Sequence, residues 1–305
     1  MITKHLERAN KNFWLTMMAA PGLIFILIFA YVPMIGIILA FKEFNYDMGI
    51  FRSPSVGFTN FQYFFANPDS WRITRNTILL NALFIATGTI CSVGFALMLN
   101  ELTKRYLIKL YQTIFFFPYF LSWVVVGYMF YAFFNQSYGM LNGLLQIFGI
   151  EPVQWYSNPK PWPAILAFVN IWKGVGYSCI IYYASLMGID QSLYEAAYID
   201  GAGRWKMITS ISIPLIKPLI IMLTILSIGK IFNSDFGMFY HLTRDQGELY
   251  PTTDVIDTYV FRMLKIYDDI GMSTAVSLYQ GVVGFVLVVA TNLIVRRIEP
   301  EYSLF

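Results

Sequence analysis

Four long uncharged runs restrict how this chain can fold more than any other feature of its sequence. Each has at least 25 residues without Asp, Glu, Lys or Arg, more than the ~20 that a helix needs to cross ~30 Å of hydrocarbon. Backbone polar groups find no water there, so runs of this length must form helices that satisfy their own hydrogen bonds. The runs are residues 13–41, 76–100, 110–150 and 270–295.

Two further runs are apolar but carry lysines. Residues 161–189 contain Lys173, and residues 213–235 contain Lys217 and Lys230 near their ends. The run 110–150 is expected to hold one crossing that ends near Phe134, because the segment that follows is rich in turn-forming residues. Only 13% of the residues are charged, about half the usual share of a soluble domain. The sequence therefore predicts an all-α polytopic membrane protein with six transmembrane helices in one domain, residues 1–305.

The distribution of basic residues predicts the orientation. Eleven of the 21 Lys and Arg residues lie in the short segments 1–12, 101–109, 190–217 and 296–305. Because cytoplasmic loops are enriched in Lys and Arg, we expect these segments and both termini to be cytoplasmic. The first run is too long for a signal-peptide core and is expected to be retained. The main outer loops are then residues 42–75, 135–160 and 236–269.

Several kinds of chemistry are not supported by the sequence. It has no Cys/His cluster, no phosphate-binding loop of the Walker type and no nucleophile constellation, so we expect no metal, no cofactor and no catalytic residue in this chain. Cys91 and Cys179 both fall in apolar runs and offer no disulfide pattern. The net charge of +3 is explained by membrane topology without a nucleic-acid partner.

The segment 193–218, LYEAAYIDGAGRWKMITSISIPLIKP, is polar and punctuated by glycine between two apolar runs. We interpret residues 193–199 as a short helix with Glu195 in its first turn, where the helix dipole favours an anion. Gly201 permits a bend, and a second helix begins at Arg204, with Pro214 kinking or restarting it. Such a helix–bend–helix is shaped to insert into a groove of another protein, although a simply solvated loop is the alternative.

The order of residues in this segment resembles the EAA loop of ABC-importer permeases. The resemblance rests on Glu195-Ala196-Ala197, on Asp200-Gly201-Ala202-Gly203 and on Pro214. It extends to Leu226–Asn233, Asp254–Val260 and Glu301–Phe305, which look like the MalF-like branch of carbohydrate permeases for polysaccharides and complex oligosaccharides.

The resemblance implies a type I importer permease of the bacterial cell membrane that carries oligosaccharides by alternating access. Its implied partners are a second homologous permease, two ATP-binding subunits that bind ATP and Mg, and a periplasmic or extracellular solute-binding protein. The residues implied to couple to the ATPase are Glu195, Ala196, Ala197, Asp200, Gly201, Ala202, Gly203 and Pro214.

A sugar pathway should place polar and aromatic groups at membrane depth. A charge there costs roughly 2.5–3.5 kcal/mol on insertion scales, so Lys173 is a candidate functional residue. Asn170, Lys173 and Tyr177 share one helical face, and Asn233 and Asp235 form a second candidate set near the outer end of the fifth helix. Alternatively, Lys173 pairs with an acid or a backbone carbonyl, or extends towards the membrane surface.

The outer segment 236–269 carries two further candidates. Asp254 and Asp257 either contact the solute-binding protein or are solvated. Three other protein classes remain open as alternatives. A secondary transporter coupled to ions would show ionisable relays and broken-helix repeats, and a membrane-embedded enzyme would show clustered His, Asp or Ser. An ABC permease for a non-sugar solute, such as amino acids or phosphate, is the nearest competitor.

Overall fold

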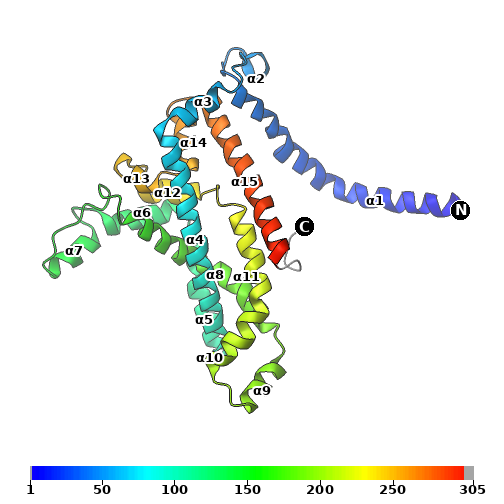
Figure 1. Ribbon diagram of the computed structural model, residues 1–305, viewed down its shortest axis with the longest axis vertical. Helices are drawn as coiled ribbons and strands as arrows, with labels where there is room; N and C mark the ends of the chain where they lie inside the picture. Colours follow the sequence, from blue (N-terminus) through cyan, green and yellow to red (C-terminus); the bar gives the residue numbers. More distant parts are fainter. Residues whose placement is uncertain (1, 299–305) are drawn as a thin grey trace. The chain divides into compact units, whose positions relative to one another are not determined.

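The computed structural model describes residues 2–298, which form helices joined by short irregular segments (Figure 1). The C-terminal stretch Glu301–Phe305, part of the resemblance, lies outside the described residues. By length and composition, the described part contains five helices able to cross a membrane, or six if one sharply bent pair counts as a span. Contacts between Cα atoms divide the chain into two compact units, the first formed by Met1–Ala66 with Met263–Leu278 and the second by Asn67–Arg262 with Tyr279–Phe305.

The first unit is built on a long helical run at the start of the chain. α1 (Ile2–Ile26) continues through a π-helical turn, η1 (Leu27–Tyr31), into the 3-10 helix η2 (Val32–Phe41). Residues 15–41 form its membrane-length part, as predicted for residues 13–41. The short helices α2 (Gly49–Arg52) and α3 (Thr59–Ala66) follow. Asn60 joins α3 to the end of η2, because its Nδ2 donates to the carbonyl oxygens of Ala40 and Lys42.

The second unit has three long helices at its centre. α4 (Pro68–Asn100) packs along α8 (Trp162–Met187), and α11 (Ile213–Ile228) contacts both. α4 begins eight residues before the predicted span 76–100, because Asn67 caps it by accepting from the backbone N–H of Asp69. Buried apolar side chains gather around Trp162 and Phe239 and, separately, around Tyr182 and Ile216. The outer rows of these helices stay exposed, as expected where lipid or another chain covers them.

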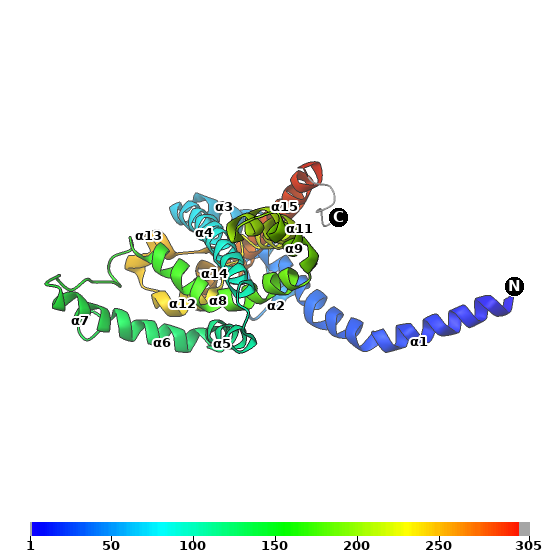
Figure 2. The same cartoon turned by 90° about the horizontal axis from the view of Figure 1, so that it is seen from below.

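The third predicted crossing is broken. α5 (Arg105–Phe116) leads into a 3-10 turn, η3 (Phe117–Phe120), and α6 (Trp123–Phe134) then leaves at 96° to the preceding helix. Figure 2 shows α5 nearly end-on while α6 runs across the view. The break follows from Pro118, which cannot donate within a helix, and from Ser122, whose hydroxyl caps α6 by accepting from Val125 N. The predicted end at Phe134 is confirmed.

The fifth predicted helix is shifted towards the N-terminus. It starts with α10 (Arg204–Met207), passes through the π-helical turn η4 (Ile208–Ser212) and continues as α11. Pro214 lacks an N–H for the carbonyl four residues earlier, which accounts for a widened turn just before it. The predicted end at residue 235 is wrong, because α11 ends at Ile228, seven residues earlier. Residues 229–235 are irregular instead.

The predicted outer loops of the second unit contain further helices. α7 (Met140–Ile147) lies in the segment 135–160. The segment 236–269 contains α12 (Phe236–Thr243), η5 (Gly247–Leu249), α13 (Tyr250–Thr253) and α14 (Ile256–Lys265). α15 (Ile270–Ile298) is the last membrane-length helix. The helix α9 (Gln191–Ile199) projects from the opposite end of the α4–α8–α11 group from α12 and α13 (Figure 1).

Candidate functional site

A cavity of about 610 Å³ lies between α4, α8 and α11 and is bordered by the irregular segment 229–235. Hydroxyl, carboxamide and charged groups line it together with apolar side chains such as Phe84 and Leu223. Polar groups at this depth are costly unless they face a water-filled or solute-filled space. The polar lining residues are Asn81, Thr89, Ser92, Asn170, Tyr177, Ser178, Tyr182, Ser227, Lys230, Asn233 and Asp235.

The structure brings four of the five predicted pathway residues together. Asn170 and Tyr177 on α8, and Asn233 and Asp235 after α11, all line the cavity. Asn233 and Asp235 were predicted near the outer end of the fifth helix. They lie instead in the irregular segment after it, because α11 ends at Ile228. An irregular backbone at this depth is tolerated where it is buried in protein or borders a cavity.

Lys173 does not line the cavity. Its Nζ donates to the carbonyl oxygen of Tyr119 at 2.9 Å and lies over the rings of Tyr119 and Trp123. The contact with a backbone carbonyl matches one of the alternatives that the sequence left open. The carbonyl belongs to the break between α5 and α6, where the helical hydrogen bonding is interrupted. A role of Lys173 in transport stays a prediction.

Two stacked aromatic rings lie beside Lys173, and one of them, that of Tyr177, lines the cavity. The rings of Tyr119 and Tyr177 are stacked, with centroids 5.0 Å apart and planes inclined by 11°. Both side chains are more than 40% exposed, so a face or edge remains open to a solute. Sequence reasoning selected Tyr177 as a pathway residue but did not select Tyr119. The break at Pro118 was the signal that could have placed Tyr119 beside α8.

Asp235 is held in place from two sides. Its Oδ2 accepts from Trp123 Nε1 at 2.6 Å, and its Oδ1 caps α12 by accepting from the backbone N–H of Met238. The segment that leads to it is fixed as well, because Asn81 Nδ2 donates to the carbonyl oxygen of Ile231 at 2.7 Å. Gln280 on α15 donates similarly to the carbonyl oxygen of Phe232. The irregular wall of the cavity is therefore an ordered structure.

The acids Asp254 and Asp257 are held by groups of this chain, and Asp254 is buried while Asp257 is half-buried. Asp257 accepts from the backbone N–H of Ser234 at 2.8 Å and from Gln280. Burial raises the pKa of its carboxyl above the usual value, although these two donors act in the opposite direction. Asp254 is only 1% exposed. Both interpretations that the sequence offered for Asp254, a partner contact and a solvated charge, are wrong.

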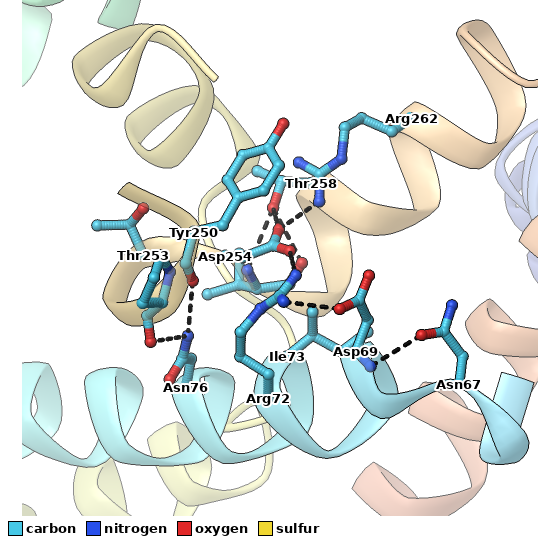
Figure 3. A network of polar contacts seen from close by, with 12 residues as sticks. Asn67, Asp69, Arg72, Ile73, Asn76, Tyr250, Thr253, Asp254, Thr258 and Arg262 are labelled. Carbon is cyan, nitrogen blue, oxygen red and sulfur yellow. Dashed lines mark hydrogen bonds and ion pairs between the residues drawn. The ribbon is translucent and has the colours of Figure 1, made fainter. Parts of the chain in front are cut away.

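Asp254 is instead the centre of a buried ion-pair network (Figure 3). Its Oδ2 accepts from Arg72 Nη2 at 3.0 Å, and its Oδ1 accepts from Arg262 Nη2 and from the hydroxyl of Thr258. Arg262 also donates to Asp245 at 2.7 Å. The network joins the first turns of α4 to α14 and to the turn after α12.

The segment 190–217 begins with a capped helix. Asp190 caps α9 by accepting from the backbone N–H of Ser192, and this hydrogen bond lowers the pKa of Asp190. The helix therefore starts at Gln191, two residues before the predicted start. Glu195 lies in the second turn, so its predicted place in the first turn is wrong. Asp190 takes the position that the helix dipole favours.

The predicted bend after this helix has a defined geometry. Gly201 has φ +79°, a left-handed conformation that glycine adopts without strain. The backbone N–H of Ala202 donates to the carbonyl of Ala197, and that of Gly201 donates to Tyr198. This pair of hydrogen bonds is a Schellman motif, which satisfies the last carbonyls of the helix. Gly201 thus lies just after α9, at the bend that the sequence predicted.

Most of the predicted coupling residues are accessible. Glu195, Ala196, Asp200, Gly201, Gly203 and Pro214 are exposed, while Ala197 and Ala202 are half-buried. Three large side chains that sequence reasoning did not select surround the bend, because Tyr198, Ile199 and Trp205 are 76%, 83% and 80% exposed. Clustered exposed apolar side chains mark interaction sites more often than single ones do. Their closeness to the bend in sequence was the available signal.

Membrane-length helices around a polar cavity, with an ordered loop at one end, define a polytopic transport protein. A family model described as "Binding-protein-dependent transport system inner membrane component" matches residues 85–300. This chain belongs to that family of permeases. The predicted helical permease fold and the resemblance to ABC-importer permeases are confirmed.

Relatives and solved structures agree with this assignment. Protein LplB of Bacillus subtilis is 35% identical over 292 residues, covering 96% of this chain and 91% of LplB. The polygalacturonan/rhamnogalacturonan permease YteP of the same organism is 33% identical, covering 94% and 89%. The fold matches a chain of a bacterial ABC transporter involved in the import of the acidic polysaccharide alginate, with a TM-score of 0.88, 34% identity and coverage of 97% and 99%. The fold also matches a chain of a bacterial alginate ABC transporter solved in complex with an alginate pentasaccharide-bound periplasmic protein, with a TM-score of 0.86, 34% identity and coverage of 96% and 97%.

Proposed function

We propose that this chain is a permease subunit of an ATP-driven importer for oligosaccharides in a bacterial cell membrane, with both termini cytoplasmic. The observation that carries the proposal is the likeness, over nearly the whole length of both chains, to a permease chain of a polysaccharide importer. The cavity between α4, α8 and α11 supports it, because hydroxyl and carboxamide groups beside exposed aromatic rings suit a sugar.

The chain supplies one half of the pathway, and a second homologous permease supplies the other. A solute-binding protein delivers the sugar at the outer side, and two ATP-binding subunits bind ATP and Mg at the cytoplasmic side. In the cavity, Tyr177, which is itself stacked on Tyr119, presents its ring to a sugar, while Asn170, Asn233 and Asp235 form hydrogen bonds with hydroxyl groups. Lys173 fixes the carbonyl of Tyr119 and so positions that ring.

The segment 190–217 couples the pathway to ATP hydrolysis. α9 inserts into a cleft of an ATP-binding subunit, with Glu195 meeting a basic residue there. The exposed side chains of Tyr198, Ile199 and Trp205 supply an apolar contact around the polar one. When the ATP-binding subunits close, the movement of α9 passes through the bend at Gly201 to α10 and then to α11, which borders the cavity.

Reconstituted transporter tests this function. The chain, its partner permease, the ATP-binding subunits and the solute-binding protein are placed in liposomes, and ATP turnover and sugar uptake are measured. We expect an oligosaccharide-loaded binding protein to stimulate turnover, and Glu195→Lys to abolish that stimulation while leaving membrane insertion intact. Glu151→Lys, the same charge reversal at an exposed residue outside the segment, is the matched control and should behave like the wild type.

The pathway is tested with Tyr177→Leu and Lys173→Ala. Both should lower sugar uptake in complexes that assemble normally, and a loss of assembly would show that the residue acts only in packing. Stimulation by an amino-acid-loaded binding protein would favour the non-sugar alternative. Uptake driven by an ion gradient without ATP would contradict the proposal as a whole.

A further inference from the structure

A second hollow, of about 350 Å³, lies outside the cavity described above. It is bordered by the end of α6, by the turn after it, by residues 154–157 and by the segment that follows α12. This place is near the N-terminal end of α8, whereas α9 follows the C-terminal end. The 26 residues of α8 separate the two ends by about 39 Å. In the proposed orientation, the hollow therefore faces the outer side.

Arg244 lines this hollow, and its guanidinium is not paired with a carboxylate among the residues that the structure describes. Its Cζ lies 4.0 Å from the centre of the Tyr131 ring. Within the described part of the chain, no carboxylate lies within 4.0 Å of it and no acceptor takes a hydrogen bond from it. Arg72 and Arg262 in the same unit are both paired with carboxylates. Arg244 is thus an exposed cation whose donors are available to a ligand.

The backbone that carries Arg244 is held in an unfavourable conformation. Arg244 and the next residue, Asp245, have φ values of +56° and +50°, a region that residues with side chains rarely adopt. Asp245 is fixed from inside, because it accepts from Arg262 Nη1 at 2.7 Å and from the hydroxyl of Tyr250 at 3.2 Å. The buried ion pair therefore stabilises the turn and leaves Arg244 on its open side. Strained residues that are held in this way cluster at ligand sites.

The other groups around Arg244 are suited to hydroxyl groups and sugar rings. The exposed carboxamides of Gln136, Gln154 and Gln246 line the hollow, and each offers both a donor and an acceptor. Glu248 adds an acceptor on the same wall. Tyr131 adds an aromatic ring, and the guanidinium of Arg244 lies over that ring.

We propose that this hollow binds an acidic sugar unit, with the carboxylate of a uronate accepting two hydrogen bonds from the Arg244 guanidinium. A planar carboxylate matches the fork of an arginine, and such paired, charge-assisted bonds are stronger than neutral ones. The carboxamides bind the ring hydroxyls of the same unit. The inference rests on the proposed oligosaccharide import and deepens it, because it assigns a negative charge to the substrate and a reception site ahead of the membrane cavity.

Direct binding to the purified full chain in lipid nanodiscs tests the inference without the transport partners. The probe is a trisaccharide of galacturonic acid, and its fully methyl-esterified form is the neutral control with the same rings. We expect the acid form to bind about tenfold more tightly than the ester. Arg244→Gln should weaken binding of the acid form by about the same factor and leave binding of the ester unchanged. Arg244→Lys, which keeps the charge but loses the fork, should fall in between.

Two further variants keep the test decisive. Arg52→Gln removes an exposed arginine outside the second unit and should leave both affinities unchanged. If Arg244→Gln fails to fold, Gln154→Ala removes a carboxamide without touching the strained turn and should weaken both probes. Equal affinity for acid and ester would overturn the inference, as would a full affinity of Arg244→Gln for the acid.

A separate readout distinguishes a sugar site from a protein-docking site. If Arg244→Gln weakens association with the solute-binding protein while the affinity for the acid trisaccharide is unchanged, the hollow is a docking surface and the inference is wrong. The proposed function fails differently, through the absence of ATP-dependent uptake of any oligosaccharide in the wild-type complex. Uptake of neutral oligosaccharides only would preserve the proposed function and reject the acidic site.

Discussion

The hydroxyl groups of Tyr194 and Ser212 lie 2.8 Å apart and form a hydrogen bond across the bend in the segment 190–217. Tyr194 is on α9, and Ser212 is the last residue of the π-helical turn η4 before α11. Ser212 is only 2% exposed. The bond therefore connects the exposed helix that we propose to meet the ATP-binding subunit with a membrane-length helix that borders the cavity.

Replacing Tyr194 by Phe should weaken this connection without changing the shape of either helix. A typical net hydrogen bond contributes about 1 kcal/mol, so we expect stimulated ATP turnover to fall by about fivefold while basal turnover is preserved. The measurement is ATP hydrolysis by the reconstituted complex with and without loaded binding protein. Tyr106→Phe, at an exposed tyrosine on α5, should have no effect. Full stimulation in Tyr194→Phe would show that the bond does not transmit movement.

Alanine substitutions at Gly201 and Gly203 can be compared to test whether the bend requires a left-handed backbone conformation. Neither glycine has another atom within 4 Å of an added Cβ, but only Gly201 has a positive φ. Gly201→Ala should therefore destabilise the end of α9 by roughly 1–2 kcal/mol, whereas Gly203→Ala should not. Hydrogen exchange of the backbone amides of Gly201 and Ala202 measures the difference. Equal exchange rates in the two variants would argue against the Schellman motif.

Asp254 should be among the least replaceable residues of the second unit. Asp254→Asn leaves the guanidiniums of Arg72 and Arg262 next to a neutral group, and removing one partner of a buried ion pair typically costs about 3–5 kcal/mol. Unfolding of the purified chain in detergent, followed by thermal shift, provides the measurement. Asp47→Asn changes an exposed carboxylate and should shift stability by less than about 0.5 kcal/mol. Comparable shifts for both variants would contradict a supporting role of the network.

Close packing of α5 on α8 depends on Gly176. A Cβ there would overlap the backbone carbonyl of Phe115, whereas a Cβ at Gly174 on the same helix would meet nothing within 4 Å. We expect Gly176→Ala to cost about 1–3 kcal/mol of stability through the displacement of α5. Gly174→Ala should be neutral or slightly stabilising, because alanine favours a helix. The two melting temperatures in detergent decide between these outcomes.

The half-buried Asp257 should make stability depend on pH in a direction opposite to that of most acids. Its pKa is raised above 3.8, mainly by burial, so the folded chain binds its proton more tightly than the unfolded chain does. Stability should therefore fall as the pH rises from 3.8 through the raised pKa. Asp257→Asn mimics the protonated form and should flatten this part of the profile of melting temperature against pH. An unchanged profile would show that Asp257 does not titrate in this window.

The sequence predicts the membrane helices well because their signal is local. Uncharged length alone identifies the run 13–41 and the run 270–295, and glycine with flanking polar residues identifies the bend at Gly201. The boundaries that failed depend on distant contacts. The segment after Ile228 is held in an irregular conformation by Asn81 and Gln280, which donate to the carbonyls of Ile231 and Phe232, and neither residue is near it in sequence.

The candidate site was predictable only in part, for a similar reason. Asn170 and Tyr177 share a helical face, so periodicity places them on one wall. In the sequence, Asp254 resembles any acid of an outer loop. Its two guanidinium partners, Arg72 and Arg262, are brought to it only by the fold. No pattern along the chain links residues separated by 182 positions. Residue type gives the chemistry of a group, but its partner decides whether that group is available.

The break between α5 and α6 has a consequence for how this chain enters a bilayer. An interrupted helix leaves the carbonyl of Tyr119 without its normal donor, and Lys173 on α8 provides one. An unpaired carbonyl and an unpaired ammonium group each cost free energy in hydrocarbon, and the hydrogen bond between them lowers both costs. Insertion of the third crossing and insertion of the fourth are therefore interdependent, because each helix provides the polar partner that the other needs inside the membrane.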